Sequence, residues 1–306
     1  MDTKVILLIG VGNLGKRYLE ALSKVTIKLE IYLVDVIKEN IDKALNLCKT
    51  CTHVIHSDDK IPEIKKIDLC IVSTCSDVRK KITEQIINKY EISYLILEKF
   101  LFQTEDDYYV IQKLIKEKNI KCWINCPRRT YYFYNILKNN LKGQKIIKFK
   151  VIGNNWNMCS NLVHFLDLYT YLTDEIKELE LKCDTLFESK RNSYYDMYGT
   201  VKSTDNIIEI INTKNTCQLV KEIETKDYKC TIINDGGTLS MKDSRGNCSY
   251  TVPYLSVYMN EVVTDILTTG KCELTPYDES MKIHLSVLKI FLEELKKHNI
   301  NNCQIT

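Results

Sequence analysis

The sequence has no apolar run long enough to cross a membrane, which takes about 20 consecutive apolar residues. It leaves no room for a secretory signal peptide, because the first expected strand begins at Val5. It also lacks an excess of one charge: 43 basic and 40 acidic residues give +3, too little for a nucleic-acid-binding surface. We therefore expect a protein that binds neither membranes nor nucleic acids.

Zinc-binding cysteine pairs are missing too, although the chain has 13 cysteines. Zinc sites usually repeat one short cysteine spacing. Here the close pairs have unequal gaps and no matching second pair: Cys48 and Cys51, Cys70 and Cys75, Cys122 and Cys126. Other cysteines lie in apolar strand patterns, where a thiol acts as a small hydrophobic group. We expect no metal site, and the cytoplasm, where thiols stay reduced, as the compartment.

Glycine is scarce, with 10 in 306 residues, yet three fall together near the N-terminus. They follow an apolar run over 5–9, which predicts a strand buried on both faces, and they open an amphipathic helical pattern. Gly10, Gly12 and Gly15 have the G-x-G-x-x-G spacing. This spacing allows a tight turn, close approach of the backbone to a pyrophosphate, and close packing of helix on strand. Free amides at the helix start would hold the phosphate charge.

A second apolar strand over 29–34 ends in Asp35, twenty residues after Gly15. A carboxylate at that place accepts the adenosine ribose hydroxyls of a dinucleotide. The alternative is a glycine-rich turn that binds nothing, but strand, glycines, helix and acid occur here in the expected order. Val36 and Ile37 offer no arginine for the extra phosphate of NADP, and Lys38 is the nearby cation, so we expect NAD in preference to NADP.

The alternation of strands and helices changes part-way along the chain. Up to about residue 120, strands over 52–55, 67–73, 92–97 and 121–125 alternate with helices over 38–49, 77–89 and 104–118. This predicts a Rossmann-type, doubly wound parallel sheet in a domain spanning 1–124. The second domain, 125–306, has a helix over 161–172 and strands over 145–153, 178–187, 207–212, 216–224, 228–233 and 238–242. Two helices, 254–268 and 276–297, close it. Strands in succession predict an α+β domain with an open, mostly antiparallel sheet.

Three motifs in this order resemble the glucose–fructose oxidoreductase/inositol dehydrogenase/MocA (Gfo/Idh/MocA) family. Residues 97–100, Leu-Glu-Lys-Phe, are similar to its Glu-Lys-Pro signature, with Phe100 in place of proline. Residues 125–129, Asn-Cys-Pro-Arg-Arg, resemble the segment that leaves the Rossmann domain. Residues 161–167 resemble the helix that carries the family's histidine, here His164, with Ser160 where the family often has an acid. The similarity extends over nearly the whole chain.

The resemblance implies roles for individual residues. His164 would take the hydroxyl proton and Lys99 would hydrogen-bond the reacting oxygen. From the sequence alone, a half-buried structural histidine and a surface lysine are the favoured interpretations, and the resemblance reverses both. Glu98 would orient Lys99 or cap the next turn. The cofactor candidates are Gly10, Gly12, Asn13, Leu14, Gly15, Asp35, Thr74, Cys75, Glu98 and Lys99.

The expected substrate residues are Ser160, Asn161, Asp167 and Arg129. Of the adjacent Arg128 and Arg129, we expect one to bind an anionic substrate and the other to join the two domains by a salt bridge, and we assign the ligand to Arg129.

The sequence thus predicts an NAD(P)-dependent oxidoreductase that transfers hydride between nicotinamide and a small sugar or sugar derivative, either nucleotide-linked or acidic. The resemblance also suggests a surface-polysaccharide pathway. One alternative is a non-catalytic protein of the same fold that senses a dinucleotide or sugar nucleotide. Another keeps the family but changes the substrate, to a cyclic tetrapyrrole or an amino-acid-derived imine. The open sheet face predicts a homodimer or homotetramer.

Overall fold

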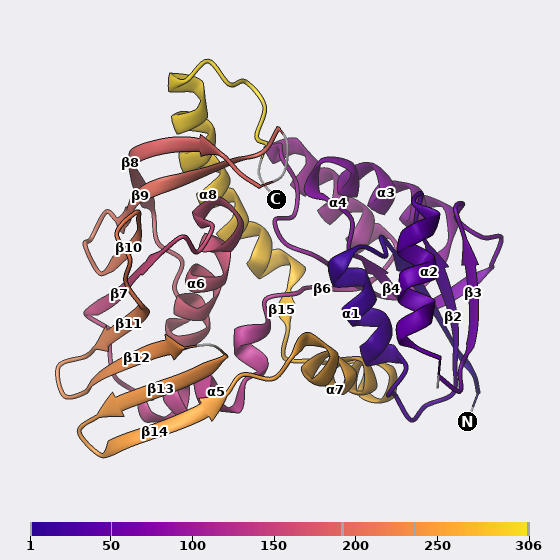
Figure 1. Cartoon of the computed structure of the whole chain (residues 1–306), viewed down its shortest axis with the longest axis horizontal. Helices are drawn as coiled ribbons and strands as arrows, with labels where there is room; N and C mark the ends of the chain where they lie inside the picture. Colours follow the sequence, from indigo (N-terminus) through magenta and orange to yellow (C-terminus); the bar gives the residue numbers. More distant parts are fainter. Residues whose placement is uncertain (1, 50, 191–192, 236, 305–306) are drawn as a thin grey trace. The chain divides into compact units, whose positions relative to one another are not determined.

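The computed structural model describes residues 2–49, 51–190, 193–235 and 237–304. The chain forms two compact units, each built on one sheet (Figure 1). The first consists of Met1–Asn125 and Pro253–Asp278, and the second of Cys126–Val252 and Glu279–Thr306. The sequence analysis gave Pro253–Asp278 to the second domain, and this assignment was wrong. That segment packs a helix on the first helix of the chain and adds a short strand to the first sheet.

The first unit has a seven-stranded sheet in the order β15-β6-β5-β4-β1-β2-β3. Its six parallel strands are β1 (Lys4–Ile9), β2 (Leu29–Val34), β3 (Val54–Asp58), β4 (Lys66–Val72), β5 (Glu91–Leu97) and β6 (Lys121–Ile124). The short β15 (Thr275–Pro276) pairs antiparallel with β6. The strand order reverses between β1 and β4, so the carboxyl ends of these two strands form the ligand-binding edge of a doubly wound sheet.

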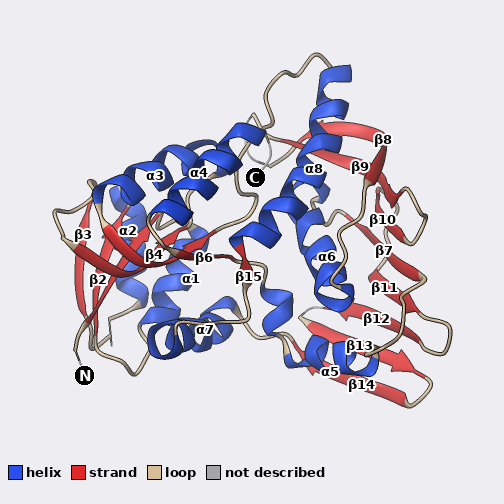
Figure 2. Cartoon of the chain, turned by 180° about the vertical axis from the view of Figure 1, so that it is seen from behind, coloured by secondary structure: helices blue, strands red, loops and turns tan. Residues whose placement is uncertain are grey.

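Helices cover both faces of this sheet (Figure 2). They are α1 (Asn13–Leu22), α2 (Lys38–Leu47), α3 (Ser76–Lys89), α4 (Glu105–Glu117) and α7 (Leu255–Thr269). α1 contacts α2 and α7, and α3 contacts α4. The central strands β1 and β4 are apolar and almost completely buried, as the continuous hydrophobic runs predict. Strand β3 lies later than the expected 52–55, because its register is set by pairing with β2 up to Val34 and Asp58.

The second unit has an eight-stranded sheet in the order β14-β13-β12-β11-β7-β10-β9-β8. Its strands are β7 (Lys148–Asn154), β8 (Leu179–Glu188), β9 (Tyr195–Ser203), β10 (Ile208–Thr213), β11 (Leu219–Glu224), β12 (Lys229–Asp235), β13 (Thr238–Asp243) and β14 (Gly246–Thr251). Only the pair β7 and β10 is parallel among the strand pairs described in this unit. The predicted fold class, a Rossmann sheet followed by a mostly antiparallel sheet, is confirmed.

The described helices of the second unit lie on one face of its sheet (Figure 1). They are the 3-10 helix η1 (Pro127–Thr130), α5 (Tyr132–Asn140), α6 (Met158–Thr173) and most of α8 (Tyr277–Lys297). Alternate residues of β7 and β10 are buried beneath these helices. On the opposite side of the strands, side chains pair across the sheet, as Lys150 does with Glu209.

The sequence analysis did not predict β9, β14 or α5. Strand β9 contains Gly199, a residue that weakens strand patterns. This glycine is required there, because a Cβ at its position would lie 2.4 Å from the carbonyl oxygen of Lys182 on β8. The close approach lies next to an irregularity in β8 between Cys183 and Thr185.

Candidate cofactor and substrate site

The glycine loop between β1 and α1 has the geometry of a dinucleotide-binding turn. Gly10 has a φ of +85°, which favours glycine. A Cβ at Gly15 would lie 2.1 Å from the carbonyl oxygen of Gly10, so only glycine lets α1 pack this closely on the loop. A Cβ at Gly12 would meet nothing within 4 Å, which leaves open space beside the N-terminus of α1. Asn13 and Leu14 form the first turn of that helix, which has no acidic residue to oppose a phosphate.

Asp35 fastens the end of β2 to this loop. One of its carboxylate oxygens accepts a hydrogen bond of 2.6 Å from the amide of Val11, and the other accepts one of 2.8 Å from the amide of Ile37. The side-chain amide of Asn40 lies 3.3 Å from both oxygens. A carboxylate with two oxygens can accept further bonds, so ribose hydroxyls remain compatible with this arrangement.

The loop after β4 lies against the glycine loop. The hydroxyl of Ser73 donates to the carbonyl of Gly10 over 2.5 Å. Thr74 is half-buried, and the exposed Cys75 is the N-cap residue of α3. The structure therefore places Thr74 and Cys75 at the same carboxyl edge as Gly10, where the sequence predicted them.

Arg79, which the sequence analysis did not single out, holds two loops of this edge together. It is a buried residue of α3, and its guanidinium donates to the carbonyl oxygens of Thr74, Phe100 and Leu101. Burial lowers its pKa to about 10, which still leaves it charged at neutral pH. The sequence carries no signal for this role of Arg79, because its acceptors are backbone carbonyls.

Glu98 and Lys99 follow β5 at the same edge of the sheet. Glu98 is buried and accepts hydrogen bonds from the hydroxyl of Tyr18 and from the side-chain amide of Asn125, at 2.5 and 2.7 Å. Lys99 is half-buried, and the peptide bond between Lys99 and Phe100 is cis. Glu98 is thus tied to α1 and to the end of β6, which fixes the backbone from which Lys99 projects.

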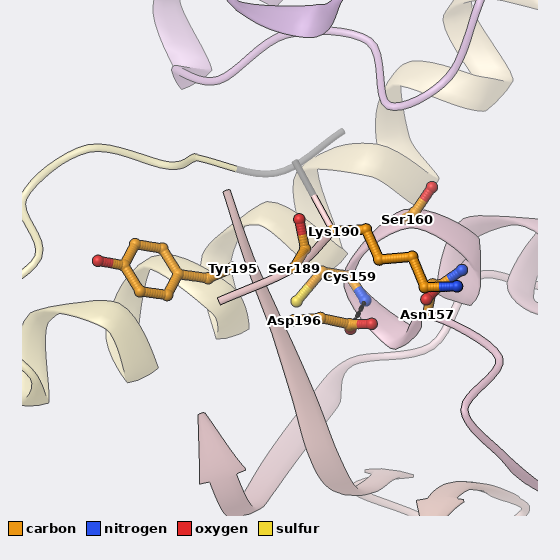
Figure 3. A pocket seen from close by; sticks show the side chains of 7 residues that line it. All are labelled: Asn157, Cys159, Ser160, Ser189, Lys190, Tyr195 and Asp196. Carbon is orange, nitrogen blue, oxygen red and sulfur yellow. Dashed lines mark hydrogen bonds between the residues drawn. The ribbon is translucent and has the colours of Figure 1, made fainter. Parts of the chain in front are cut away.

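In the second unit, α6 carries Ser160 and Asn161 in one turn and His164 about one turn later. His164 is half-buried, and the side-chain amide of Asn161 donates to the carbonyl of Trp156 over 2.7 Å. Ser160 lines a cavity of about 190 Å³ with Asn157, Cys159, Ser189, Lys190, Tyr195 and Asp196 (Figure 3).

Asp196 organises the wall of this cavity. Its carboxylate accepts hydrogen bonds from the backbone amides of Cys159 and Met197, at 3.0 and 2.8 Å. Burial raises the pKa of Asp196, although these amides favour the charged form. Asp196 therefore satisfies amides at the start of α6 and positions the helix that carries Ser160 and His164.

Arg129 and Asp167 pair with each other inside the second unit. The guanidinium of Arg129 makes a forked interaction with the carboxylate of Asp167, at 3.0 Å from Nε and 2.8 Å from Nη2, and Nη2 also contacts Glu279 at 2.6 Å. Burial alone would lower the pKa of Arg129, but the two carboxylates outweigh it and raise that pKa. All three residues belong to the second unit, so the pair neither joins the two units nor offers Arg129 as the free cation that the sequence analysis assigned to substrate.

Comparison with known proteins identifies the first unit. Residues 4–126 match the model of the oxidoreductase family with an NAD-binding Rossmann fold, GFO_IDH_MocA. These residues belong to the Gfo/Idh/MocA family. The resemblance inferred from the motifs is thereby confirmed, and with it an NAD(P)-binding oxidoreductase fold. No curated protein matches the sequence significantly.

Solved structures of low sequence identity share the fold over nearly the whole chain. Biliverdin reductase from Synechocystis sp., in complex with biliverdin and NADP+, has a TM-score of 0.72 and 14% identity, covering 94% of this chain and 97% of that one. An oxidoreductase from Agrobacterium radiobacter in complex with NAD+, L-tartaric acid and magnesium has a TM-score of 0.71 and 12% identity, covering 93% and 94%. A super-repressor mutant of Gal80p from Saccharomyces cerevisiae has a TM-score of 0.74 and 13% identity, covering 97% of each chain. Such identities establish the fold and not the substrate.

None of the helices in the described part of the chain is both long and apolar enough to cross a membrane. No group of three or more histidine, cysteine, aspartate or glutamate side chains among the described residues is arranged to hold a metal ion.

Proposed function

We propose that the protein is an NAD-dependent oxidoreductase that transfers hydride between nicotinamide and a sugar or sugar derivative. The observation that carries the proposal is the assembly at one sheet edge of the glycine loop, Asp35 and the Glu98–Lys99 segment. The open space at Gly12 and the free first turn of α1 fit a pyrophosphate, and Asp35 fits a ribose. When bound, the dinucleotide supplies the hydride acceptor or donor.

Lys99 and His164 are the proposed catalytic residues. The ammonium of Lys99 would hydrogen-bond the oxygen of the reacting carbon and stabilise its developing negative charge. The imidazole of His164 would take or return the hydroxyl proton. Glu98 is anchored by Tyr18 and Asn125, so Lys99 projects from a backbone that cannot easily shift. Ser160 and Asn161, one turn before His164, are the proposed contacts to substrate hydroxyls.

NAD is the proposed cofactor in preference to NADP. Asp35 would bond the ribose hydroxyls of NAD and repel the extra phosphate of NADP. Val36 and Ile37 are exposed beside it and offer no positive charge. The structural relatives include proteins solved with NAD+ and with NADP+, so this preference rests on the residues around Asp35.

The experiment is absorbance at 340 nm with NADH and a panel of keto-sugars, and with NAD+ and the corresponding alcohols. We expect turnover that falls about 100-fold or more in His164→Ala and in Lys99→Ala, because general acid–base catalysis is typically worth that much. NADH affinity, measured by fluorescence, should stay nearly unchanged in both variants. NADH binding without turnover on any member of the panel would instead favour the sensing protein of the same fold.

We also propose self-association through the sheet face of the second unit that lies opposite its helices. That face carries cross-strand ion pairs, for example between Lys150 and Glu209 and between Lys148 and Glu222. Light scattering should give the mass of a dimer or tetramer, and a monomer mass at micromolar concentration would contradict the proposal.

A further inference from the structure

Lys221 is a fully buried lysine that has no carboxylate partner in the described part of the chain. It lies on β11 with an exposed fraction of 0%, and its ammonium donates to the side-chain oxygen of Asn234 over 2.5 Å. Its second neighbour is the ring of Phe165 on α6, with the nitrogen 5.9 Å from the ring centroid. An amide oxygen and an aromatic face are weak compensation for burying a positive charge.

Arg128 brings a second positive charge to the same aromatic ring. Its guanidinium carbon lies 4.4 Å from the centroid of Phe165, and it hydrogen-bonds the hydroxyl of Tyr134. Arg128 is half-buried, and no ion pair to it occurs among the described residues. Burial lowers the pKa of Lys221 well below its usual value, and the nearby Arg128 lowers it further. Arg128 and Lys221 thus lie against the same aromatic ring, and no carboxylate among the described residues pairs with either.

The lack of a carboxylate partner at Lys221 and Arg128 does not extend to the neighbouring residue. Arg129, the next residue along the chain, has two carboxylate partners, Asp167 and Glu279. The sequence analysis gave the ligand to Arg129 and an interdomain salt bridge to its neighbour, whereas it is Arg129 that carboxylates neutralise, within the second unit. Arg128 retains the planar fork that matches a carboxylate or a phosphate.

We propose that Arg128 and Lys221 form an anion-binding subsite in the second unit, which takes a carboxylate or phosphate group of the substrate. Arg128 contacts the anion, whose negative charge favours the protonated form of Lys221 beside the ring of Phe165, where low dielectric strengthens the attraction. Lys221 therefore acts on the anion through its charge and does not contact it directly. The inference rests on the proposed function only in calling the anion a part of the substrate.

Trp156 provides a reporter for this subsite, because its ring packs edge-on against Phe165 with centroids 5.1 Å apart. The chain has two tryptophans, so Trp123→Phe leaves Trp156 as the only one. In that full-length background, inorganic phosphate and acetate are titrated separately at constant ionic strength, without cofactor. We expect a saturable fluorescence change. Its affinity should fall about tenfold or more in Arg128→Gln, and at least about threefold in Lys221→Met.

Two exposed cations of the second unit serve as matched controls: Arg245→Gln and Lys289→Met, each of which already pairs with a carboxylate. Both should leave anion affinity unchanged. Melting temperatures show whether Lys221→Met folds, which we expect because it replaces a fully buried amine by an apolar side chain of similar length. Lys221→Leu is a second neutral variant. A stronger response to phosphate than to acetate, or the reverse, identifies the group that the subsite takes.

Absence of a saturable response to both anions, or equal affinity in Arg128→Gln and the parent, would overturn the subsite. The assay contains no NAD, so its result is independent of turnover. Anion binding without turnover would contradict the proposed function and support the subsite. Turnover of an acidic sugar with KM unchanged in Arg128→Gln would contradict the subsite and support the proposed function.

Discussion

Replacing Arg129 by alanine should destabilise the second unit strongly. The substitution removes the forked interaction with Asp167, whose side chain is only 1% exposed, and the contact with Glu279. Asp167 would then be a buried carboxylate deprived of its arginine. Breaking a buried ion pair by removing one partner costs about 3–5 kcal/mol. For a unit of this size that corresponds to a melting temperature lower by roughly 6–20 °C.

The measurement is urea unfolding of the full chain, followed by the fluorescence of Trp156 in the Trp123→Phe background. Trp156 lies in the same unit as Arg129, so its signal reports the transition of that unit. Lys289→Ala is the control, because Lys289 of the same unit also pairs with a carboxylate, that of Glu178, but their side chains are 64% and 71% exposed. A surface pair is worth about 0–1 kcal/mol, so the control should change little.

The double variant Arg129→Ala with Asp167→Asn tests the cause of the loss. It should be more stable than Arg129→Ala alone, because the asparagine removes the buried charge left without its partner. Two results together would refute the structural role of Arg129: a loss of unfolding free energy below about 1 kcal/mol in Arg129→Ala and a strongly raised KM for an anionic substrate. They would indicate that Arg129 binds the substrate.

Two further predictions concern the cofactor edge. Asp35→Ser should narrow the preference for NADH over NADPH by about tenfold in fluorescence titrations, because it removes the charge that repels the extra phosphate; equal or tighter binding of NADPH by the parent protein would contradict the assignment. Gly15→Ala should abolish measurable NADH binding and lower the melting temperature, because the new methyl group would lie 2.1 Å from the carbonyl oxygen of Gly10. Gly143→Ala is its control, since a Cβ there meets nothing within 4 Å, although its φ of +76° makes a small loss of stability expected. Normal NADH binding by Gly15→Ala would show that the loop does not hold the cofactor.

The sequence by itself determined the cofactor half of the protein. The strand over 5–9, the three glycines and Asp35 lie within about thirty residues, and each is required by a local constraint: a positive φ, a close helix or an acid at a strand end. Local spacing therefore specified the geometry found around Gly10, Gly15 and Asp35. The change from alternating helices and strands to successive strands likewise specified both sheets.

Long-range pairing was decided only by the tertiary structure. Whether Arg128 or Arg129 was neutralised depended on where Asp167 and Glu279 lay, and these residues are 38 and 150 positions away from Arg129. The return of Pro253–Asp278 to the first unit depended on packing against α1, which an amphipathic pattern does not identify. The role of Arg79 was hidden because its acceptors are backbone carbonyls, which every residue has.

Lys221 lies between these two cases. The alternation in β11 places it on the same face as Ile223, so its burial could have been predicted from the sequence. Its lack of a carboxylate partner could not, because that depended on Phe165 from α6 and Arg128 from η1 packing over it. The sequence determines which residues face inward, whereas the balance of charge among them is fixed only when distant segments pack together.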